Sequence, residues 1–241
     1  KRMYAEVLDA LARFDEDDEV RCIVVTGARK AFCAGVELKS DEPTFGRSTN
    51  EPSSGEPFLK THPFHMKTPI IAAINGHAVG AGLTMPLQYD IRIVAEDAKL
   101  GFPFVRRGVI PELAAHWILP RMIGVSLAAE LLLTGRIFSG TEAVEMGLAS
   151  KAVPKEQVLE TALAMAEDIA VNCAPVPVAL TKRQLWAYLD SEYEDAHAKE
   201  HQYFQWTAKQ LDSVEGVKSF MEKRRPEWSL RNSEHFPSDT P

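Results

Sequence analysis

The chain has 241 residues, of which 45% are hydrophobic and 25% are charged, and its net charge is -7. This composition is typical of a soluble globular protein with room for one large domain or a domain with an appendage. The acidic balance excludes a general attraction to nucleic acid or anionic membranes. The cysteines (Cys22, Cys33 and Cys173) fit free thiols in a reducing cytoplasm. No apolar run reaches the ~18 residues of a membrane span, and no signal peptide opens the chain.

The first elements alternate between strands and small-residue turns. Residues 3–13 are predicted as an amphipathic helix, so we expect an N-terminal strand to be missing before it. A strand over 20–26 ends at Gly27 and is followed by the turn 31–38. Residues 40–62 are rich in Pro, Gly and Ser and are predicted as a mobile loop. Two interpretations of that loop are open, a lid or pocket wall and a tolerated surface insertion.

A second small-residue turn follows the buried strand predicted over Ile70–Ile74. The strand ends at Asn75-Gly76, and Gly80-Ala81-Gly82 then opens a helical segment. Free N–H groups at such a turn converge, and they can hold an anion or an oxygen that becomes anionic. The glycine spacing is not that of a dinucleotide-binding turn, and no Gly-Lys-Ser/Thr follows. Taken alone, the turn is better explained by the close packing of small residues than by an anion site.

The later chain becomes helical. Strands are predicted over 90–95 and 99–102, and a helix begins with Pro111 at its first position. Ser139 and Glu142 form a predicted capping box. Helices are predicted over 114–122, 127–133, 143–146, 158–171, 178–189, 196–211 and 214–224. The pattern predicts an α/β domain over residues 1–173 and a helical region over 174–241.

With both turns in view, the chain resembles the crotonase (enoyl-CoA hydratase/isomerase) superfamily. Four segments carry the resemblance in order: Ala31–Leu38, Pro69–Gly82, Gly135–Ala149 and Phe220–Arg224. The resemblance implies a spiral of ββα units with a helical C-terminal trimerisation region and self-association to a trimer or hexamer. The cysteine content favours a cytoplasmic location. It also implies an acyl-CoA substrate, no metal, and no cofactor beyond coenzyme A as part of that substrate. Neither a nucleic acid nor a membrane is an expected partner.

The resemblance assigns roles residue by residue. The backbone N–H groups of Val36 and Ala81 would form an oxyanion hole for the thioester oxygen. Ala81 replaces a family glycine, which requires a φ accessible to an L-residue. The further candidates for substrate or coenzyme A contact are Phe32, Ala34, Glu37, Leu38, Lys39, Gly80, Thr84, Phe104, Phe220 and Lys223. Lys39 is either a coenzyme A contact or an ordinary surface charge. Arg106 and Arg107 either neutralise the phosphates of coenzyme A or are solvated surface charges.

The sequence departs from the family's hydratases at both of their catalytic glutamates. Thr84 and Phe104 stand at those positions, so no acid–base pair is placed to add water. Glu112 remains, at a position where isomerases of the family use a carboxylate as a proton shuttle. A helix-start glutamate stabilised by the helix dipole is the alternative. His116 would share a helical face with Glu112 and orient it, or it is a core or interface histidine.

These residues predict an enoyl-CoA isomerase-like enzyme in which Glu112 moves a proton along an enolate held by Val36 and Ala81. The alternatives are a hydratase with an altered acid–base set, a thioester or C–C hydrolase, and a non-catalytic acyl-CoA-binding scaffold. Cys33, His77, His62 and His65 are lesser candidates, the first two with structural roles and the other two within reach of the pocket.

Overall fold

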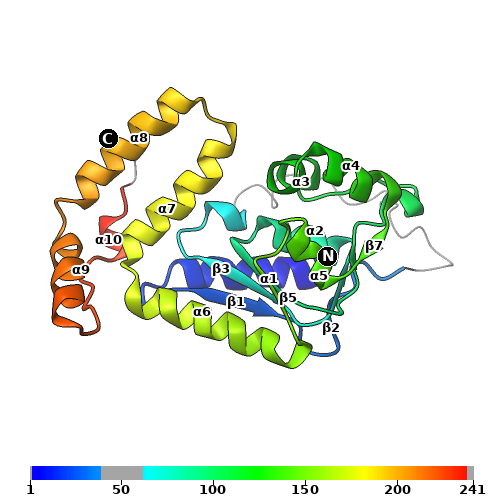
Figure 1. Cartoon of the computed structure of the whole chain (residues 1–241), viewed down its shortest axis with the longest axis horizontal. Helices are drawn as coiled ribbons and strands as arrows, with labels where there is room; N and C mark the ends of the chain where they lie inside the picture. Colours follow the sequence, from blue (N-terminus) through cyan, green and yellow to red (C-terminus); the bar gives the residue numbers. More distant parts are fainter. Residues whose placement is uncertain (1, 39–61, 238–241) are drawn as a thin grey trace. The chain divides into compact units, whose positions relative to one another are not determined.

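The computed structural model describes residues 2–38 and 62–237 (Figure 1). The predicted loop 40–62 and Lys39 therefore lie outside the described residues, except for His62. The chain forms two compact units, and each is described by itself. The helical unit comprises Lys1–Ile23, Pro63–Ile70 and Leu163–Pro241, and the sheet unit comprises Val24–His62 and Ile71–Ala162. The predicted division of the chain at residue 173 stays a prediction.

Two four-stranded sheets organise the fold. The first has the order β1-β3-β5-β8, and its β3/β5 and β5/β8 pairs are parallel. The second has the order β2-β4-β6-β7, parallel except for the β6/β7 pair. The strands are β1 (Ile23–Thr26), β2 (Ala31–Cys33), β3 (Ile70–Ile74), β4 (His77–Val79), β5 (Ile91–Ala95), β6 (Leu100–Gly101), β7 (Ile137–Phe138) and β8 (Lys151–Val153).

The long apolar strands were predictable, whereas among the short ones β6 was predicted, within 99–102, and β2, β4, β7 and β8 were missed. All five residues of β3 are buried, which explains why its sequence is uniformly apolar rather than alternating. The predicted strands over 70–74 and 90–95 are confirmed, and β1 is shorter than the predicted 20–26. The turn predicted over 31–38 begins with β2, and β4 separates Gly76 from Gly80. Strands of two or three residues carry too little periodicity to be read from sequence.

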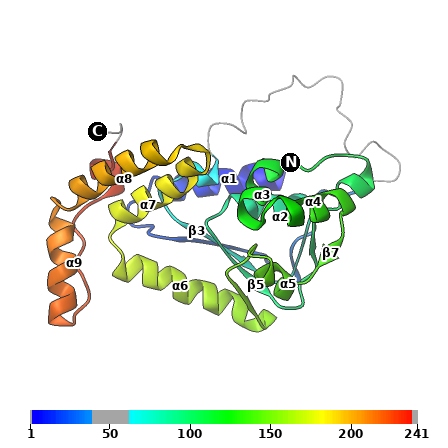
Figure 2. The same ribbon diagram turned by 45° about the horizontal axis from the view of Figure 1, so that its top comes forward.

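The helices of the sheet unit follow their strands. The segment α2 (Ala81–Thr84) continues directly into the 3-10 helix η2 (Met85–Gln88), and η3 (Val105–Arg107) precedes α3. Helices α3 (Ala115–Ile123) and α4 (Val125–Thr134) pack side by side (Figures 1 and 2). The capping box of α5 (Gly140–Glu145) is confirmed, with Glu142 N–H donating to Ser139 Oγ at 3.1 Å and Ser139 N–H to Glu142 Oε2 at 2.8 Å. The short η4 (Lys155–Gln157) leads into α6 (Val158–Asn172), whose residues from Leu163 onward belong to the helical unit.

A buried arginine fixes the segment after α2. Arg92 on β5 donates through Nε to Leu148 O at 2.7 Å, and through Nη1 to Pro86 O at 3.2 Å and Tyr89 O at 2.7 Å. Burial lowers the pKa of Arg92 to about 10, so the guanidinium stays charged at neutral pH. Because two of these carbonyls belong to η2 and the residue after it, the guanidinium ties that turn to the sheet.

The helical unit contains α1 (Arg2–Asp15), η1 (Pro63–His65), α7 (Pro175–Ala187), η5 (Tyr188–Asp190), α8 (Tyr193–Thr207), α9 (Leu211–Glu222) and α10 (Asn232–His235). Helix α7 packs against α8, around a core of Val176, Leu180, Tyr203 and Leu230. Helix α7 begins at Pro175, not at the predicted 178, because proline is well tolerated in a first helical turn. The predicted helices 196–211 and 214–224 correspond to α8 and α9, each of which begins three residues earlier.

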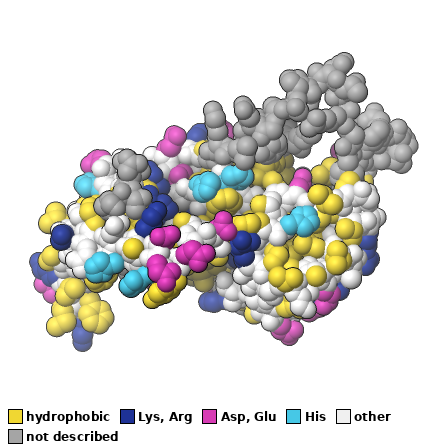
Figure 3. Space-filling view, turned by 90° about the horizontal axis from the view of Figure 1, so that it is seen from above, with side chains coloured by type: hydrophobic (Ala, Val, Ile, Leu, Met, Phe, Trp, Pro, Cys, Tyr) yellow, Lys and Arg dark blue, Asp and Glu magenta, His cyan; other side chains and the backbone are white. Residues whose placement is uncertain are grey.

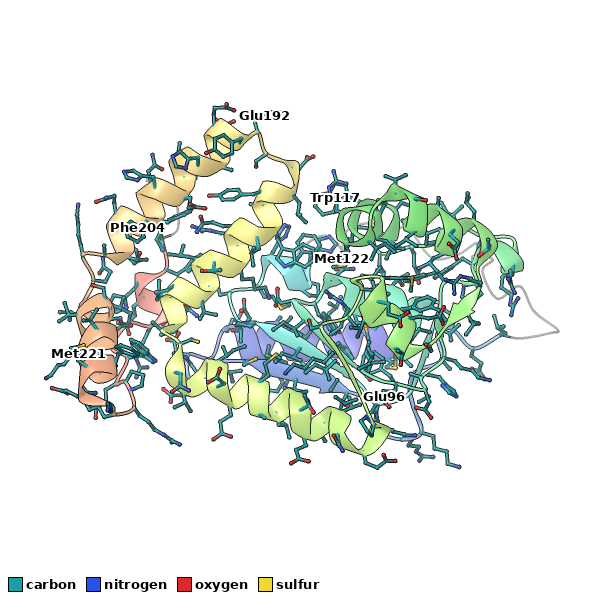
Figure 4. All side chains as sticks on the ribbon, viewed as in Figure 1. Glu96, Trp117, Met122, Glu192, Phe204 and Met221 are labelled. Carbon is teal, nitrogen blue, oxygen red and sulfur yellow. The ribbon has the colours of Figure 1, made fainter. Side chains whose placement is uncertain are left out.

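Apolar side chains remain exposed on both units. Phe204 of α8 and Met221 of α9 are 66% and 74% exposed (labelled in Figure 4), and Phe220 is 80% exposed. On the sheet unit, apolar side chains gather over α3 and α4 (yellow in Figure 3), where Val125 and Leu133 are exposed. The predicted trimer or hexamer would cover such surfaces, and it stays a prediction. Among the described residues no single helix is long and apolar enough to cross a membrane, although the bent pair Lys155–Asn172 and Pro175–Asp190 passes that test jointly.

Candidate active site

The two small-residue turns lie side by side because they leave neighbouring parallel strands. Strands β2 and β4 pair with Ala31 opposite His77 and Cys33 opposite Ala78. The turns that follow are in backbone contact, since a Cβ on Gly82 would lie 2.0 Å from Cys33 O and one on Gly35 would lie 2.6 Å from Val79 O. Only glycine permits these approaches. The glycines thus determine the distance between the two turns.

Asn75, at the start of the second turn, hydrogen-bonds to the backbone that leads into the first. Its Oδ1 accepts the Gly27 N–H at 3.1 Å, and its Nδ2 donates to Gly27 O at 2.7 Å and Arg29 O at 3.2 Å. A Cβ on the next residue, Gly76, would lie 2.2 Å from Lys30 O. The Asn-Gly pair, read from sequence as a turn signal, therefore also joins the end of β1 to the end of β3.

A cavity of ≈ 100 Å³ lies between the two turns. Its lining includes Ala34, Gly35, Val36 and Leu38 of the first turn, Val79, Gly80 and Ala81 of the second, and Pro103, Phe104 and Arg107. Within the described residues, the N–H groups of Val36 and Ala81 donate no hydrogen bond. Two unengaged donors at one small cavity are the arrangement that stabilises an oxyanion.

The Ala81 substitution is accommodated without strain. Ala81 is the first residue of α2, and it is not among the non-glycine residues of positive φ in the described chain. The left-handed positions of the two turns are occupied by Gly35 (φ +85) and Gly80 (φ +60). Alanine at position 81 therefore keeps the N–H and adds only a methyl group.

Phe104 and Thr84, which the resemblance places at the positions of the two hydratase glutamates, are both uncharged. Phe104 is 9% exposed, and its Cζ lies 3.9 Å from the position of a Cβ on Gly80. Thr84 is fully buried, and its Oγ1 has no hydrogen-bond partner in the described part of the chain. An unsatisfied buried hydroxyl costs about 1–3 kcal/mol. Neither side chain supplies an acid or a base. Arg107 is the charged residue in the lining.

Glu112 is not where the sequence analysis placed it. Helix α3 begins at Ala115 and not at Pro111, so the helix dipole does not act on Glu112 as a first-turn residue. Leu113 (φ 55) and Ala114 (φ 58) intervene in the left-handed region, at a cost of roughly 1–2 kcal/mol per residue. The predicted helical face shared by Glu112 and His116 is therefore wrong. A proline that is suited to a first helical turn gives no sign that two residues after it, neither of them glycine, have left-handed backbone.

The carboxyl of Glu112 is partly desolvated. The side chain as a whole is exposed, yet burial of the carboxyl raises its pKa above the usual glutamate value. Glu112 is not among the residues that line the cavity. A glutamate whose ionised form is disfavoured can both take and give a proton.

Gln88 is a residue of this region that the sequence analysis missed. It is fully buried at the end of η2, and its Nε2 donates to Leu113 O at 3.4 Å. His62 Nδ1 lies 3.2 Å from Gln88 Oε1. The available signal was a lone amide within the largely apolar stretch Leu83–Tyr89.

The remaining candidates are dispersed. Ala34 and Leu38 line the cavity, whereas Phe32 and Glu37 do not. Lys39 lies outside the described residues. Phe220 and Lys223 belong to the helical unit, at the end of α9, where Lys223 caps the helix with φ 55. No His, Cys, Asp and Glu cluster suited to a metal occurs in the part of the chain that was searched, residues 2–38 and 62–237.

Comparison with known proteins identifies the family. A family profile described as Enoyl-CoA hydratase/isomerase matches residues 1–231. An enoyl-CoA hydratase of Alternaria alternata is 42% identical over 227 residues, which are 93% of this chain and 76% of that protein. A probable enoyl-CoA hydratase of Bacillus subtilis is 35% identical and covers 94% of this chain and 88% of its own.

The chain belongs to the enoyl-CoA hydratase/isomerase family. A solved structure of a probable enoyl-CoA hydratase/isomerase from Mycobacterium abscessus has a TM-score of 0.87 at 43% identity, covering 93% of this chain and 87% of that one. The α/β crotonase-like fold expected from the sequence is therefore confirmed. The family membership brings an acyl-CoA substrate class with it, and it leaves the choice between hydratase and isomerase open.

Proposed function

We propose that the protein is an enoyl-CoA isomerase-like member of its family. The observation that carries this proposal is a cavity with two unengaged N–H donors and, within the described residues, no carboxylate in its lining, on a chain that retains Glu112, a glutamate of raised pKa, as the proposed acid. One carboxyl suffices to move a proton between two carbons, whereas the family's hydratase chemistry uses two to handle water.

The proposed reaction begins with a 3-enoyl-CoA thioester whose carbonyl oxygen accepts hydrogen bonds from the N–H groups of Val36 and Ala81. The carboxylate of Glu112 removes a proton from the α carbon, and the electron pair moves onto the thioester oxygen to give a dienolate. The same carboxyl group then returns the proton to the γ carbon, and the double bond ends between the α and β carbons. Losing one oxyanion donor in a comparable hole costs about 3–4 kcal/mol of transition-state stabilisation.

The hydratase alternative is favoured by the names of the relatives, which are enoyl-CoA hydratases. In that case Glu112 would activate water and also supply the proton to the α carbon, so one residue would do the work of two. A non-catalytic acyl-CoA-binding trimer is the alternative that needs no acid at all. In each reading coenzyme A enters only as part of the ligand, with Lys39, Phe220 and Lys223 as proposed contacts to it.

Product analysis separates these alternatives. The protein is incubated with a 3-enoyl-CoA in one reaction and with a 2-enoyl-CoA in another, and the thioesters are resolved by chromatography and mass spectrometry. An isomerase converts the 3-enoyl-CoA to a product of unchanged mass. A hydratase adds the mass of one water to the 2-enoyl-CoA. If the thioesters bind in a calorimeter but neither product forms, the non-catalytic reading replaces the proposal.

A further inference from the structure

The turn that carries Glu112 is unusual among the described residues. Leu113 and Ala114 are consecutive residues of positive φ without a glycine, and Lys223 is the further non-glycine example within residues 2–38 and 62–237. Left-handed backbone at non-glycine residues persists only where the surrounding structure enforces it. Ala114 is also the N-cap residue of α3 and offers no side-chain hydrogen bond to that helix. Some contact outside the turn must therefore hold it.

Gln88 supplies such a contact. Its side chain is fully buried at the end of η2, against which α3 packs. Its amide Nε2 donates to Leu113 O at 3.4 Å, and its Oε1 faces His62 Nδ1 at 3.2 Å. A buried amide has no water to replace a lost partner, so relaxation of the turn would leave Gln88 unsatisfied. The amide and the strained turn therefore constrain each other.

The anchor belongs to the same helical segment as one of the oxyanion donors. Ala81 opens α2, and η2 continues it without interruption to Gln88. The Arg92 guanidinium holds Pro86 O and Tyr89 O, one on each side of Gln88. The position of Gln88 relative to the Ala81 N–H is therefore fixed by backbone and by a buried cation.

We propose that Gln88 is a positioning residue that holds the Glu112 turn at a fixed distance from the oxyanion hole. The proposal rests on the proposed function, because it takes Glu112 to be the proton-transfer group. The Gln88 amide does not touch substrate and acts through Leu113. Its loss would let the Leu113–Ala114 turn relax out of the left-handed region and carry the Glu112 carboxyl away from the reacting carbons.

The test compares Gln88→Met with wild type in the isomerisation of a 3-enoyl-CoA. Methionine keeps the length and fills the space of glutamine but makes neither hydrogen bond. We expect kcat to fall by roughly 10- to 100-fold, because small displacements of a reacting group have effects of this size. KM should stay within about twofold, since the oxyanion hole is intact, and the limb of the pH profile assigned to Glu112 should shift.

A second variant separates positioning from stability. Ala114→Gly relieves the left-handed strain, so we expect Gln88→Met/Ala114→Gly to unfold at a higher urea concentration than Gln88→Met. Its kcat should stay low, because the turn still lacks the hydrogen bond from Gln88 that positions Glu112. If the double variant regains wild-type kcat together with its stability, Gln88 acts only through stability and the proposal is wrong. The double variant also supplies the kinetic measurement should Gln88→Met fail to fold.

Glu112→Gln, measured beside them, keeps the two claims apart. If Glu112→Gln is inactive while Gln88→Met has wild-type kcat and pH profile, the positioning role is overturned and the proposed function stands. If Glu112→Gln isomerises at the wild-type rate, the proposed function is overturned, and the positioning role falls with it. The two failures are recognised by different variants.

Discussion

The paired turns and the Glu112 turn, which we propose carry the oxyanion donors and the acid, are held in place in opposite ways. In the paired turns, glycines let backbone pack on backbone, and Gly82 and Gly35 carry no strain that a side chain must hold. In the Glu112 turn, Leu113 and Ala114 adopt left-handed backbone without glycine, and the carbonyl of Leu113 accepts a hydrogen bond from the buried Gln88. The proposed oxyanion hole is thus formed by backbone packing, whereas we propose that the turn carrying the acid is held by the Gln88 amide and by the packing of α3.

This difference suggests which part of such a site can stay constant between reactions, the backbone donors, and which part can vary, the acid and the side chains that support it. A hole made of backbone N–H groups tolerates changes of side chain, so Ala81 can stand where the resemblance implies a glycine. A carboxyl at the end of a strained turn depends on the side chains around it. Reactions that share an enolate can therefore diverge by changing the acid and its supports, with the hole unchanged.

The largest expected effect is a loss of stability on disrupting the packing of the paired turns. In Gly82→Ala the new Cβ would lie 2.0 Å from Cys33 O, so the two turns must separate. We expect the free energy of unfolding to fall by at least about 3 kcal/mol, as measured by urea denaturation. The matched control is Gly108→Ala, at φ +72 with no atom within 4 Å, which should cost only the backbone strain of about 1 kcal/mol. Equal losses in the two variants would contradict the packing argument.

A smaller effect concerns the pH dependence of the acid. Since desolvation raises the pKa of the Glu112 carboxyl in the folded protein, the folded state binds the proton more tightly than the unfolded state. The contribution of this group to stability therefore falls as pH rises from the unfolded to the folded pKa, and it stays lower above that window. Glu112→Gln should be at least as stable as wild type at neutral pH, and the difference should vanish below the unfolded pKa of about 4.3. Urea unfolding at both pH values checks this, and a destabilised Glu112→Gln at neutral pH would contradict it.

The smallest effect is expected at Thr84. Its buried hydroxyl has no partner in the described chain, so Thr84→Val should leave the protein as stable as wild type or up to about 1 kcal/mol more stable. Isomerisation should continue at nearly the wild-type rate, because a neutral hydroxyl is neither the acid nor the base. A large fall in kcat with unchanged stability would show that Thr84 takes part in the reaction.

The sequence predicted the backbone-built part of the site and missed the part that depends on tertiary contacts. The glycine spacing beside apolar strands indicated the two turns, the family resemblance singled out Val36, Gly80 and Ala81 within them, and these residues line one cavity. The position of Glu112 was misjudged, because Pro111 suggested a first helical turn and nothing in Leu113-Ala114 indicates positive φ. Gln88 escaped notice because its role arises from burial and from contacts distant in sequence.

In the fold, too, elements that are stabilised by local contacts or by a long apolar run were predicted, and elements that are stabilised by their neighbours were missed. Ile70–Ile74 is long and uniformly apolar, and it was correctly predicted as a buried strand. The short strands β2, β4, β7 and β8 have two or three residues each, and neighbouring strands stabilise them rather than their own sequence. The capping box at Ser139 was predictable because both of its hydrogen bonds are local.

The central claim is that Glu112 alone moves the proton. The direct measurement is kcat for isomerisation of a 3-enoyl-CoA by Glu112→Gln, with binding of the thioester followed by calorimetry on the same sample. The account predicts unchanged binding and a kcat lower by roughly 10²-fold or more, the usual size of an acid–base contribution. A Glu112→Gln variant that isomerises at the wild-type rate would contradict it.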